Sequence, residues 1–181
     1  MSETPQPKLV FVTGGARSGK SSFALNEASS MPGPKAYIAT AEPLDGEMAE
    51  RIRRHREERG SGWDTLEEPV ELAALLRSVK DRYSVLLVDC LTLWLSNIYI
   101  VDRAGVEREI EGLVRVLKEL RGSPGCPSLY LVSNEVGMGI VPENRLARVF
   151  RDMAGRLNQE VAGVADEVYL VVSGIPLKVK G

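Results

Sequence analysis

Short apolar runs alternate with segments of helical periodicity along most of the chain. Five runs rich in apolar and β-branched residues predict buried strands at 9–13, 36–39, 85–89, 128–133 and 166–173. Apolar positions that recur every three to four residues predict helices at 22–28, 47–59, 70–80, 91–100, 106–120 and 145–162. We expect 63–68 to be extended or irregular and 177–180 to return as an antiparallel edge strand. This order predicts one α/β domain with a mostly parallel sheet flanked by helices.

A glycine-rich loop stands between the first predicted strand and the first predicted helix. Its sequence fits G-x-x-x-x-G-K-[ST], the pattern of a phosphate-binding loop. The glycines let backbone N–H groups face phosphate oxygens, Lys20 can reach the β- and γ-phosphates, and the Ser21 hydroxyl can ligate Mg²⁺. The alternative is a chance glycine-rich turn, which the flanking strand and helix disfavour. The predicted nucleoside triphosphate site comprises Gly14, Gly15, Ala16, Arg17, Ser18, Gly19, Lys20 and Ser21.

Two further features are expected at the carboxyl ends of strands. The run 85–88 is apolar and ends in Asp89, where nucleotide enzymes with a phosphate-binding loop place a second acid that organises Mg²⁺. The alternative for Asp89 is a turn residue at a strand end. The long segment 134–144 follows another strand, and such loops carry ligand contacts in open α/β sheets, although a plain connector has the same sequence features.

Composition narrows the classes of partner and the compartment. The formal net charge of the 181 residues is −2, which does not favour a nucleic-acid surface or a basic membrane patch. No run is long and apolar enough to predict a membrane span. Cys90 and Cys126 lack metal-site or redox spacing, which predicts reduced thiols in a cytoplasmic protein. We expect residues 1–8 to form a disordered tail and 9–181 to form the domain.

The predicted helix at 47–59, with Asp45 as its N-cap, carries the single histidine of the chain. His55 shares one helical face with Met48 and Ile52, so it lies at the edge of an apolar stripe. A lone histidine in such a place is more often structural than catalytic, so its position alone favours a structural His55, with a nucleophilic imidazole as the alternative. The arginines of this helix alternate with glutamates, which is typical of a solvated face, whereas Arg56 and Arg59 beside His55 favour phosphate contacts.

Several stretches resemble one known family when they are taken together. They are the loop at 14–21, YIATA at 37–41, DGEMAERIRRHR at 45–56, VSNEVGMGIVPEN at 132–144 and GRLNQ at 155–159. In combination they resemble the bifunctional adenosylcobinamide kinase / adenosylcobinamide-phosphate guanylyltransferase family, over the chain from about Leu9 to its end. The resemblance implies a RecA-like P-loop fold and a homotrimer.

The resemblance also implies two reactions of cobalamin biosynthesis. First, ATP or GTP phosphorylates the aminopropanol hydroxyl of adenosylcobinamide. GTP then transfers GMP to adenosylcobinamide phosphate, which gives adenosylcobinamide-GDP and pyrophosphate. In the family a histidine carries GMP covalently, and His55 falls at the matching place. Some members have a His-His pair where this chain has Arg54 followed by His55.

The match thus implies that His55 is catalytic. The loop motif predicts that Lys20 is catalytic and that Ser21 ligates Mg²⁺, and the strand end predicts Asp89 as the second Mg²⁺ ligand. The family match also implies the nucleotide contacts. The nucleotide contacts outside the phosphate-binding loop are Ala39, Thr40, Ala41, Arg56, Glu57, Glu58, Arg59, Glu67 and Asp89.

Three other interpretations stay open on the sequence. The first is a simple P-loop kinase of a small molecule, in which His55 is structural. The second is a non-catalytic nucleotide-binding switch, in which the segment 134–144 moves with the nucleotide state. The third is a family member that keeps only one of the two activities.

Overall fold

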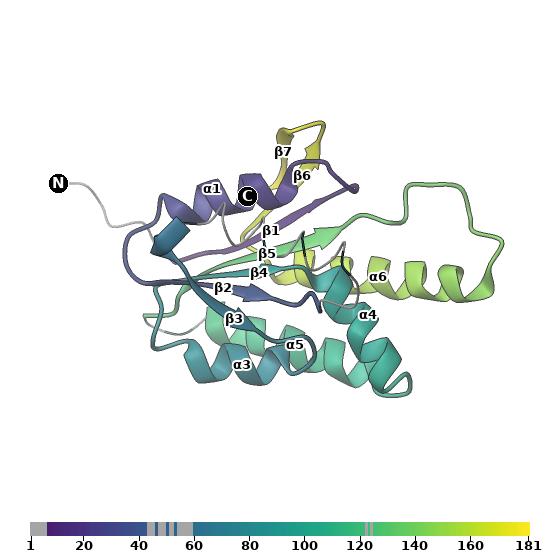
Figure 1. Ribbon diagram of the computed structural model, residues 1–181, viewed down its shortest axis with the longest axis horizontal. Helices are drawn as coiled ribbons and strands as arrows, with labels where there is room; N and C mark the ends of the chain where they lie inside the picture. The colour runs from purple at the N-terminus through teal and green to yellow at the C-terminus, as the bar shows by residue number, and fades with distance from the viewer. Residues whose placement is uncertain are drawn as a thin grey trace.

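The computed structural model describes residues 7–42, 46, 50, 53, 60–121, 123 and 125–181. In this part of the chain seven strands form one sheet in the order β3-β2-β4-β5-β1-β6-β7 (Figure 1). The strands are β1 (Leu9–Gly14), β2 (Lys35–Ala39), β3 (Asp64–Glu67), β4 (Val85–Asp89), β5 (Ser128–Asn134), β6 (Glu167–Val172) and β7 (Ile175–Lys180). The helices are α1 (Lys20–Ser29), α3 (Leu72–Val79), α4 (Leu91–Val101), α5 (Val106–Arg121) and α6 (Arg145–Val164), with a 3₁₀ turn η1 (Gly60–Gly62).

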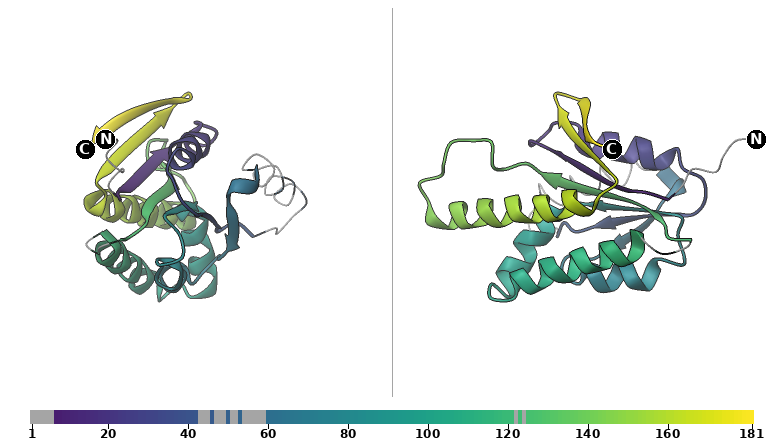
Figure 2. Two further views of the ribbon diagram at one scale, coloured as in Figure 1. Left: turned by 90° about the vertical axis from the view of Figure 1, so that its left-hand side faces the viewer. Right: turned by 180° about the vertical axis from the view of Figure 1, so that it is seen from behind.

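Alternate residues of the central strands face two separate apolar layers. In β1, Val10 and Val12 pack with α1, whereas Leu9 and Phe11 pack with the helices of the other face. Figures 1 and 2 show α1 on one side of the sheet and α3, α5 and α6 on the other. β1 to β6 pair in parallel. Almost all residues of β1, β2, β4 and β5 are buried, which explains why the sequences of these four strands are nearly continuous apolar runs.

The predicted α/β architecture is confirmed, and several elements begin or end one or two residues away from their predicted bounds. Residues 64–67, expected to be extended or irregular, form the edge strand β3. The third predicted helix begins at Leu72, because the Glu68 carboxylate accepts hydrogen bonds from the N–H groups of Val70 and Glu71 and holds that segment in a turn. β7 is antiparallel, as predicted, and begins at Ile175. Most of the helix predicted at 47–59 lies outside the described residues, although Glu50 and Arg53 are helical.

The hairpin of β6 and β7 supports the glycine-rich loop. Ser173 and Gly174 both have positive φ angles, 51° and 80°, as a two-residue hairpin turn requires. The N–H of Gly174 donates to the carbonyl of Ser18 at 2.8 Å. A Cβ on Gly19 would lie 3.2 Å from the Cα of Gly174. The chain therefore needs its small residues where the hairpin meets the loop.

A half-buried carboxylate anchors the opposite end of β6. Glu167 binds the ammonium of Lys8 at 3.1 Å and accepts a hydrogen bond from the Tyr169 hydroxyl at 2.9 Å. Burial alone would raise the pKa of Glu167, but the hydrogen bonds from Tyr169 and Lys8 outweigh burial and lower it. Burial and the bond to Glu167 raise the pKa of Tyr169 to about 12, so its hydroxyl stays a donor at neutral pH.

Glu167→Gln should make folding stability less sensitive to acid. Because the folded state lowers this carboxyl's pKa, its stabilisation is fully present above the unfolded pKa of about 4.3 and is lost as the pH falls through the lower pKa of the folded state. The melting temperature of the wild type should therefore drop more between pH 5 and pH 3 than that of the variant. Glu111→Gln, an exposed change on α5, is the control. Equal slopes for wild type and Glu167→Gln would show that this carboxylate does not contribute.

Candidate active site

The glycine-rich loop has the geometry of a phosphate cradle. It leaves the carboxyl end of β1 at Gly14 and enters α1 at Lys20. A Cβ on Gly14 would lie 2.5 Å from the carbonyl oxygen of Val171, so no side chain fits there. Gly19, the N-cap residue of α1, has a φ of 91°, which favours glycine. It has no side chain to occupy the N–H groups of the first helical turn, which therefore remain suited to an anion.

Lys20 extends back across this loop. Its side chain is buried, with 8% of its surface exposed, and Nζ donates to the carbonyl of Gly15 at 3.2 Å. Burial and then the charge of Asp89 raise the pKa of the Cys90 thiol to about 11, while the charge of Lys20 acts in the opposite direction. Both charges thus act on the same thiol. The predicted catalytic lysine and the predicted metal ligand belong to one electrostatic environment.

The register of the sheet brings the sequence-predicted residues to one edge. Gly14 pairs with Asn134, Asp89 pairs with Ala39, and Ala39 pairs with Glu67, all at the carboxyl ends of parallel strands. Strands lie about 4.8 Å apart, so Asp89 is about 10 Å along this edge from Gly14 and Glu67 is about 19 Å away. Asp89 therefore lies closer along this edge to the loop than Glu67 does, and the predicted nucleotide contacts of both residues stay predictions.

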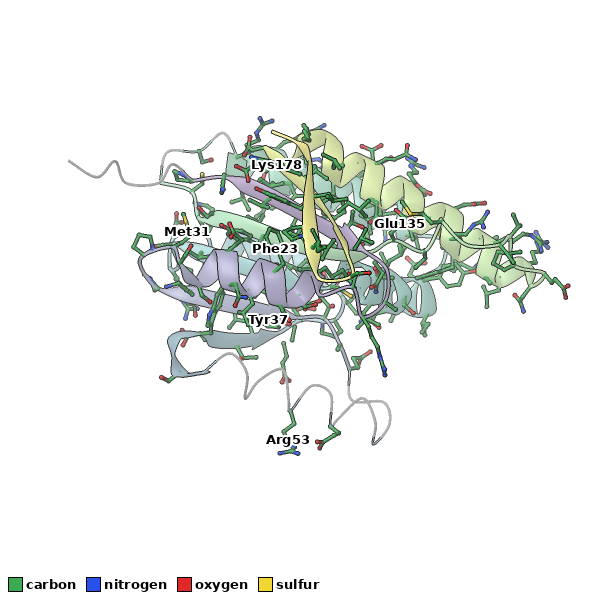
Figure 3. All side chains as sticks on the ribbon, turned by 90° about the horizontal axis from the view of Figure 1, so that it is seen from above. Phe23, Met31, Tyr37, Arg53, Glu135 and Lys178 are labelled. Atoms are coloured by element: carbon green, nitrogen blue, oxygen red, sulfur yellow. The ribbon has the colours of Figure 1, made fainter. Side chains whose placement is uncertain are left out.

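Asp89 is oriented by a tyrosine on the neighbouring strand. The Tyr37 hydroxyl donates to Oδ2 of Asp89 at 2.9 Å, and the Tyr37 ring meets the Trp63 ring edge-on with centroids 6.5 Å apart. Figure 3 shows Tyr37 on β2, beneath α1. No group of three or more Asp, Glu, His or Cys side chains suited to a metal occurs among the described residues. The oxygens of Ser21 and Asp89 suit Mg²⁺, which keeps several waters and uses substrate phosphates as further ligands.

Asp89→Asn should raise the Mg²⁺ concentration needed for half-maximal turnover by tenfold or more, because the amide lacks the charge that attracts the ion. The melting temperature should change little, since Asn can still accept the hydrogen bond from Tyr37. Tyr37→Phe is the matched control, because it removes that hydroxyl and keeps the Asp89 charge. If excess Mg²⁺ leaves the defect unchanged and the melting temperature collapses, Asp89 is structural.

A buried polar cluster that the sequence analysis missed fixes the segment after β2. The Thr40 hydroxyl donates to the carbonyl of Cys90 at 2.7 Å and accepts from its N–H at 2.8 Å. The Asn97 amide of α4 donates to the carbonyls of Thr40 and Pro69. The Thr40 N–H donates to the carbonyl of Asp89. The polar groups of Thr40 are thus engaged within the protein, and its predicted contact with nucleotide stays a prediction.

A second buried cluster lies beneath the carboxyl end of β5. The Ser133 hydroxyl donates to Asn158 of α6 at 2.7 Å and is 3.2 Å from the Thr92 hydroxyl. Thr92 in turn accepts from the N–H of Asn134, whose carbonyl accepts from Asn158. One feature of the sequence could have indicated this cluster. Asn158 is a polar residue on the apolar face of α6, between the buried residues Leu157 and Val161.

The remaining predicted residues divide into two groups. The first group holds the predicted nucleotide contacts that the structure describes, among them Arg17 and Glu67. They lie in the glycine-rich loop or at the carboxyl ends of the parallel strands. His55 and the neighbouring contacts Arg56, Glu57, Glu58 and Arg59 lie outside the described residues. Their predicted roles stay predictions.

The comparison with protein families matches residues 10–179 to the model of cobinamide kinase / cobinamide phosphate guanyltransferase. The chain belongs to this family. It is 46% identical over 171 residues to the bifunctional adenosylcobalamin biosynthesis protein CobP of Pseudomonas aeruginosa, with 94% of this chain and 96% of that relative covered. It is 45% identical over 184 residues to the bifunctional adenosylcobalamin biosynthesis protein CobU of Salmonella typhimurium, with 95% of this chain and 99% of that relative covered.

Solved structures resemble this member of the cobinamide kinase family in fold. The ATPase EscN of the type III secretion system of enteropathogenic Escherichia coli, in complex with its central stalk EscO, superposes with a TM-score of 0.60 at 12% identity over 91% of this chain. A prototypical type III secretion ATPase of pathogenic bacteria gives a TM-score of 0.56 at 13% identity over 90% of this chain. The match covers 42% and 50% of those two chains. At this identity the likeness concerns the fold alone.

Proposed function

We propose that this chain catalyses both reactions of its family, phosphorylation of adenosylcobinamide and transfer of GMP from GTP to adenosylcobinamide phosphate. The observation that carries the proposal is the convergence of the phosphate cradle and Asp89 on one sheet edge, in a chain whose family match spans residues 10–179. The curated relatives are named bifunctional adenosylcobalamin biosynthesis proteins.

In the kinase reaction the protein acts by positioning and by charge. The N–H groups of the loop and the ammonium of Lys20 hold the triphosphate and stabilise the charge that develops as the γ-phosphoryl group moves to the aminopropanol hydroxyl. Ser21 and Asp89 would hold Mg²⁺, which supplies Lewis-acid stabilisation of the phosphate oxygens. The donor is ATP or GTP.

In the guanylyltransferase reaction His55 is the nucleophile. A neutral ring nitrogen of His55 attacks the α-phosphorus of GTP, the bond to the bridging oxygen breaks, and pyrophosphate leaves. A phosphate oxygen of adenosylcobinamide phosphate then attacks the same phosphorus, and the bond to His55 breaks. The cradle and Lys20 would stabilise the leaving pyrophosphate, with Arg56 and Arg59 neutralising charge beside His55.

The same proposal includes the assembly and the compartment. Family resemblance supports a homotrimer in the cytoplasm. Ile175, Leu177 and Val179 of the edge strand β7 are exposed, and an exposed apolar strand face is a surface that oligomers can cover. Among the described residues, none of the helices is both long enough and apolar enough to traverse a membrane.

Radiolabelled GTP distinguishes the candidate functions. With α-labelled GTP the bifunctional enzyme should label itself and release pyrophosphate, then move the label to adenosylcobinamide phosphate. A simple kinase should form GDP from GTP only when adenosylcobinamide is present. A nucleotide switch should do neither quickly. A member with one activity should pass one assay and fail the other.

A further inference from the structure

The segment that follows β5 exposes an unusual number of large apolar side chains. Met138 and Ile140 have 76% and 97% of their surface exposed, and Val136, Val141 and Leu146 are exposed as well. Together these five side chains form what we call the 136–146 surface. Single exposed apolar residues are ordinary, but several within eleven consecutive residues indicate a binding surface.

Both ends of this segment are held in place by hydrogen bonds. At its start, the Glu135 carboxylate accepts from the N–H of Gly137 at 2.7 Å. At its end, Asn144 caps α6 by accepting from the N–H of Leu146 at 2.8 Å, and the guanidinium of Arg148 binds the carbonyls of Pro142 and Glu143. The apolar side chains are therefore presented by a segment with defined ends.

The segment also begins inside the candidate active site. The N–H of Glu135 donates to the carbonyl of Gly14, the first residue of the phosphate cradle, at 2.9 Å. β5 lies between β1 and β4, so the segment leaves the sheet between the cradle and Asp89. Figures 1 and 3 show it projecting beyond the sheet from this edge, with Glu135 at its base. A phosphate acceptor at the cradle would have the 136–146 surface beside it.

The acceptor's chemistry matches this arrangement. Cobinamide carries its reactive hydroxyl on a short aminopropanol arm, whereas most of its surface is a broad macrocycle with methyl groups and amide side chains. The macrocycle is too wide to enter a loop that holds phosphate, so it must lie on an open surface next to the loop, where its methyl groups can pack on exposed apolar side chains. We propose that the 136–146 surface binds the corrin ring of the substrate while the arm reaches the cradle. This inference rests on the proposed function. A second copy of the chain is the alternative occupant.

Met138→Ser combined with Ile140→Ser tests the inference. The KM for adenosylcobinamide in the kinase reaction should rise tenfold or more, because two apolar contacts with the ring are lost. Equilibrium dialysis of cobinamide, followed by its visible absorbance, should show the same loss of affinity. The kcat and the KM for nucleotide should stay within about twofold. The matched control is Ile100→Ser with Val101→Ser, two residues 74% and 70% exposed at the end of α4, which should leave all of these values unchanged.

Two results for the Met138→Ser, Ile140→Ser double variant would overturn the inference. One is an affinity for cobinamide equal to that of the wild type. The other is a molar mass of its assembly, measured by light scattering, that is lower than that of the wild type. The second result would show that another copy covers the surface. If the wild type phosphorylates no adenosylcobinamide, the proposed function fails, and dialysis decides the inference separately. In that case, if the wild type binds cobinamide in dialysis and the double variant binds it more weakly, the result still supports the inference about the 136–146 surface. If the wild type binds no cobinamide, the inference is refuted.

Discussion

His55→Ala is expected to abolish guanylyl transfer while phosphorylation of adenosylcobinamide persists. Removal of the nucleophile should lower the rate of adenosylcobinamide-GDP formation by roughly 10³-fold or more. Transfer of a γ-phosphoryl group to a hydroxyl needs no protein nucleophile, and Lys20, Ser21 and Asp89 are untouched. α-Labelled GTP should mark the wild type through an acid-labile, base-stable bond on the peptide that contains His55, and should not mark the variant.

The control for this variant comes from the same region of sequence. Arg53 forms an ion pair with Glu50 at 2.7 Å on the described part of the predicted helix. Arg53→Ala removes a charge two residues before His55 in the sequence and keeps the histidine, so it should retain the covalent label. Because the chain has no second histidine, wild-type labelling of His55→Ala would end the covalent-histidine proposal.

Lys20→Ala is expected to impair both reactions by 10²-fold or more. Both depend on triphosphate charge held in the cradle, and this ammonium is buried where electrostatic stabilisation is strong. The rates of GDP formation and of adenosylcobinamide-GDP formation, measured on the same preparation, check this expectation. Lys35→Ala, at the start of β2, removes a lysine at the opposite end of a strand and should leave both rates unchanged. Near-normal turnover of Lys20→Ala in both assays would show that 14–21 is not the catalytic cradle.

The strands at the centre of the sheet were predictable because burial on both faces leaves a continuous apolar run. β1, β4 and β5 have such sequences, and each was predicted to within one residue. β3 was not, because it is a four-residue edge strand whose residues are half-buried or exposed. The order of the strands could not be predicted either, since nothing local in β1 indicates that β5 and β6 are its neighbours.

The candidate site, like the fold, was predictable only where a local sequence pattern exists. The phosphate cradle has a sequence pattern because its backbone needs glycine at defined positions, and the structure shows why at Gly14 and Gly19. The hydrogen bonds that support the site have no such pattern. Tyr37 donates a hydrogen bond to Asp89, and Asn97 donates one to Thr40. Both bonds form because strands and helices that are far apart in the sequence pack together, so no local pattern predicts them.

The position of β1 has a consequence for synthesis on the ribosome. β1 contains the first part of the phosphate cradle, yet it pairs only with β5 at 128–134 and β6 at 167–172 within the described part of the chain. Translation at about 5–20 residues per second delays the arrival of β5 by on the order of 10 s. During that interval the apolar residues of β1 lack their partners. A nascent chain stopped before residue 128 thus contains the whole nucleotide motif without the strands that shape it.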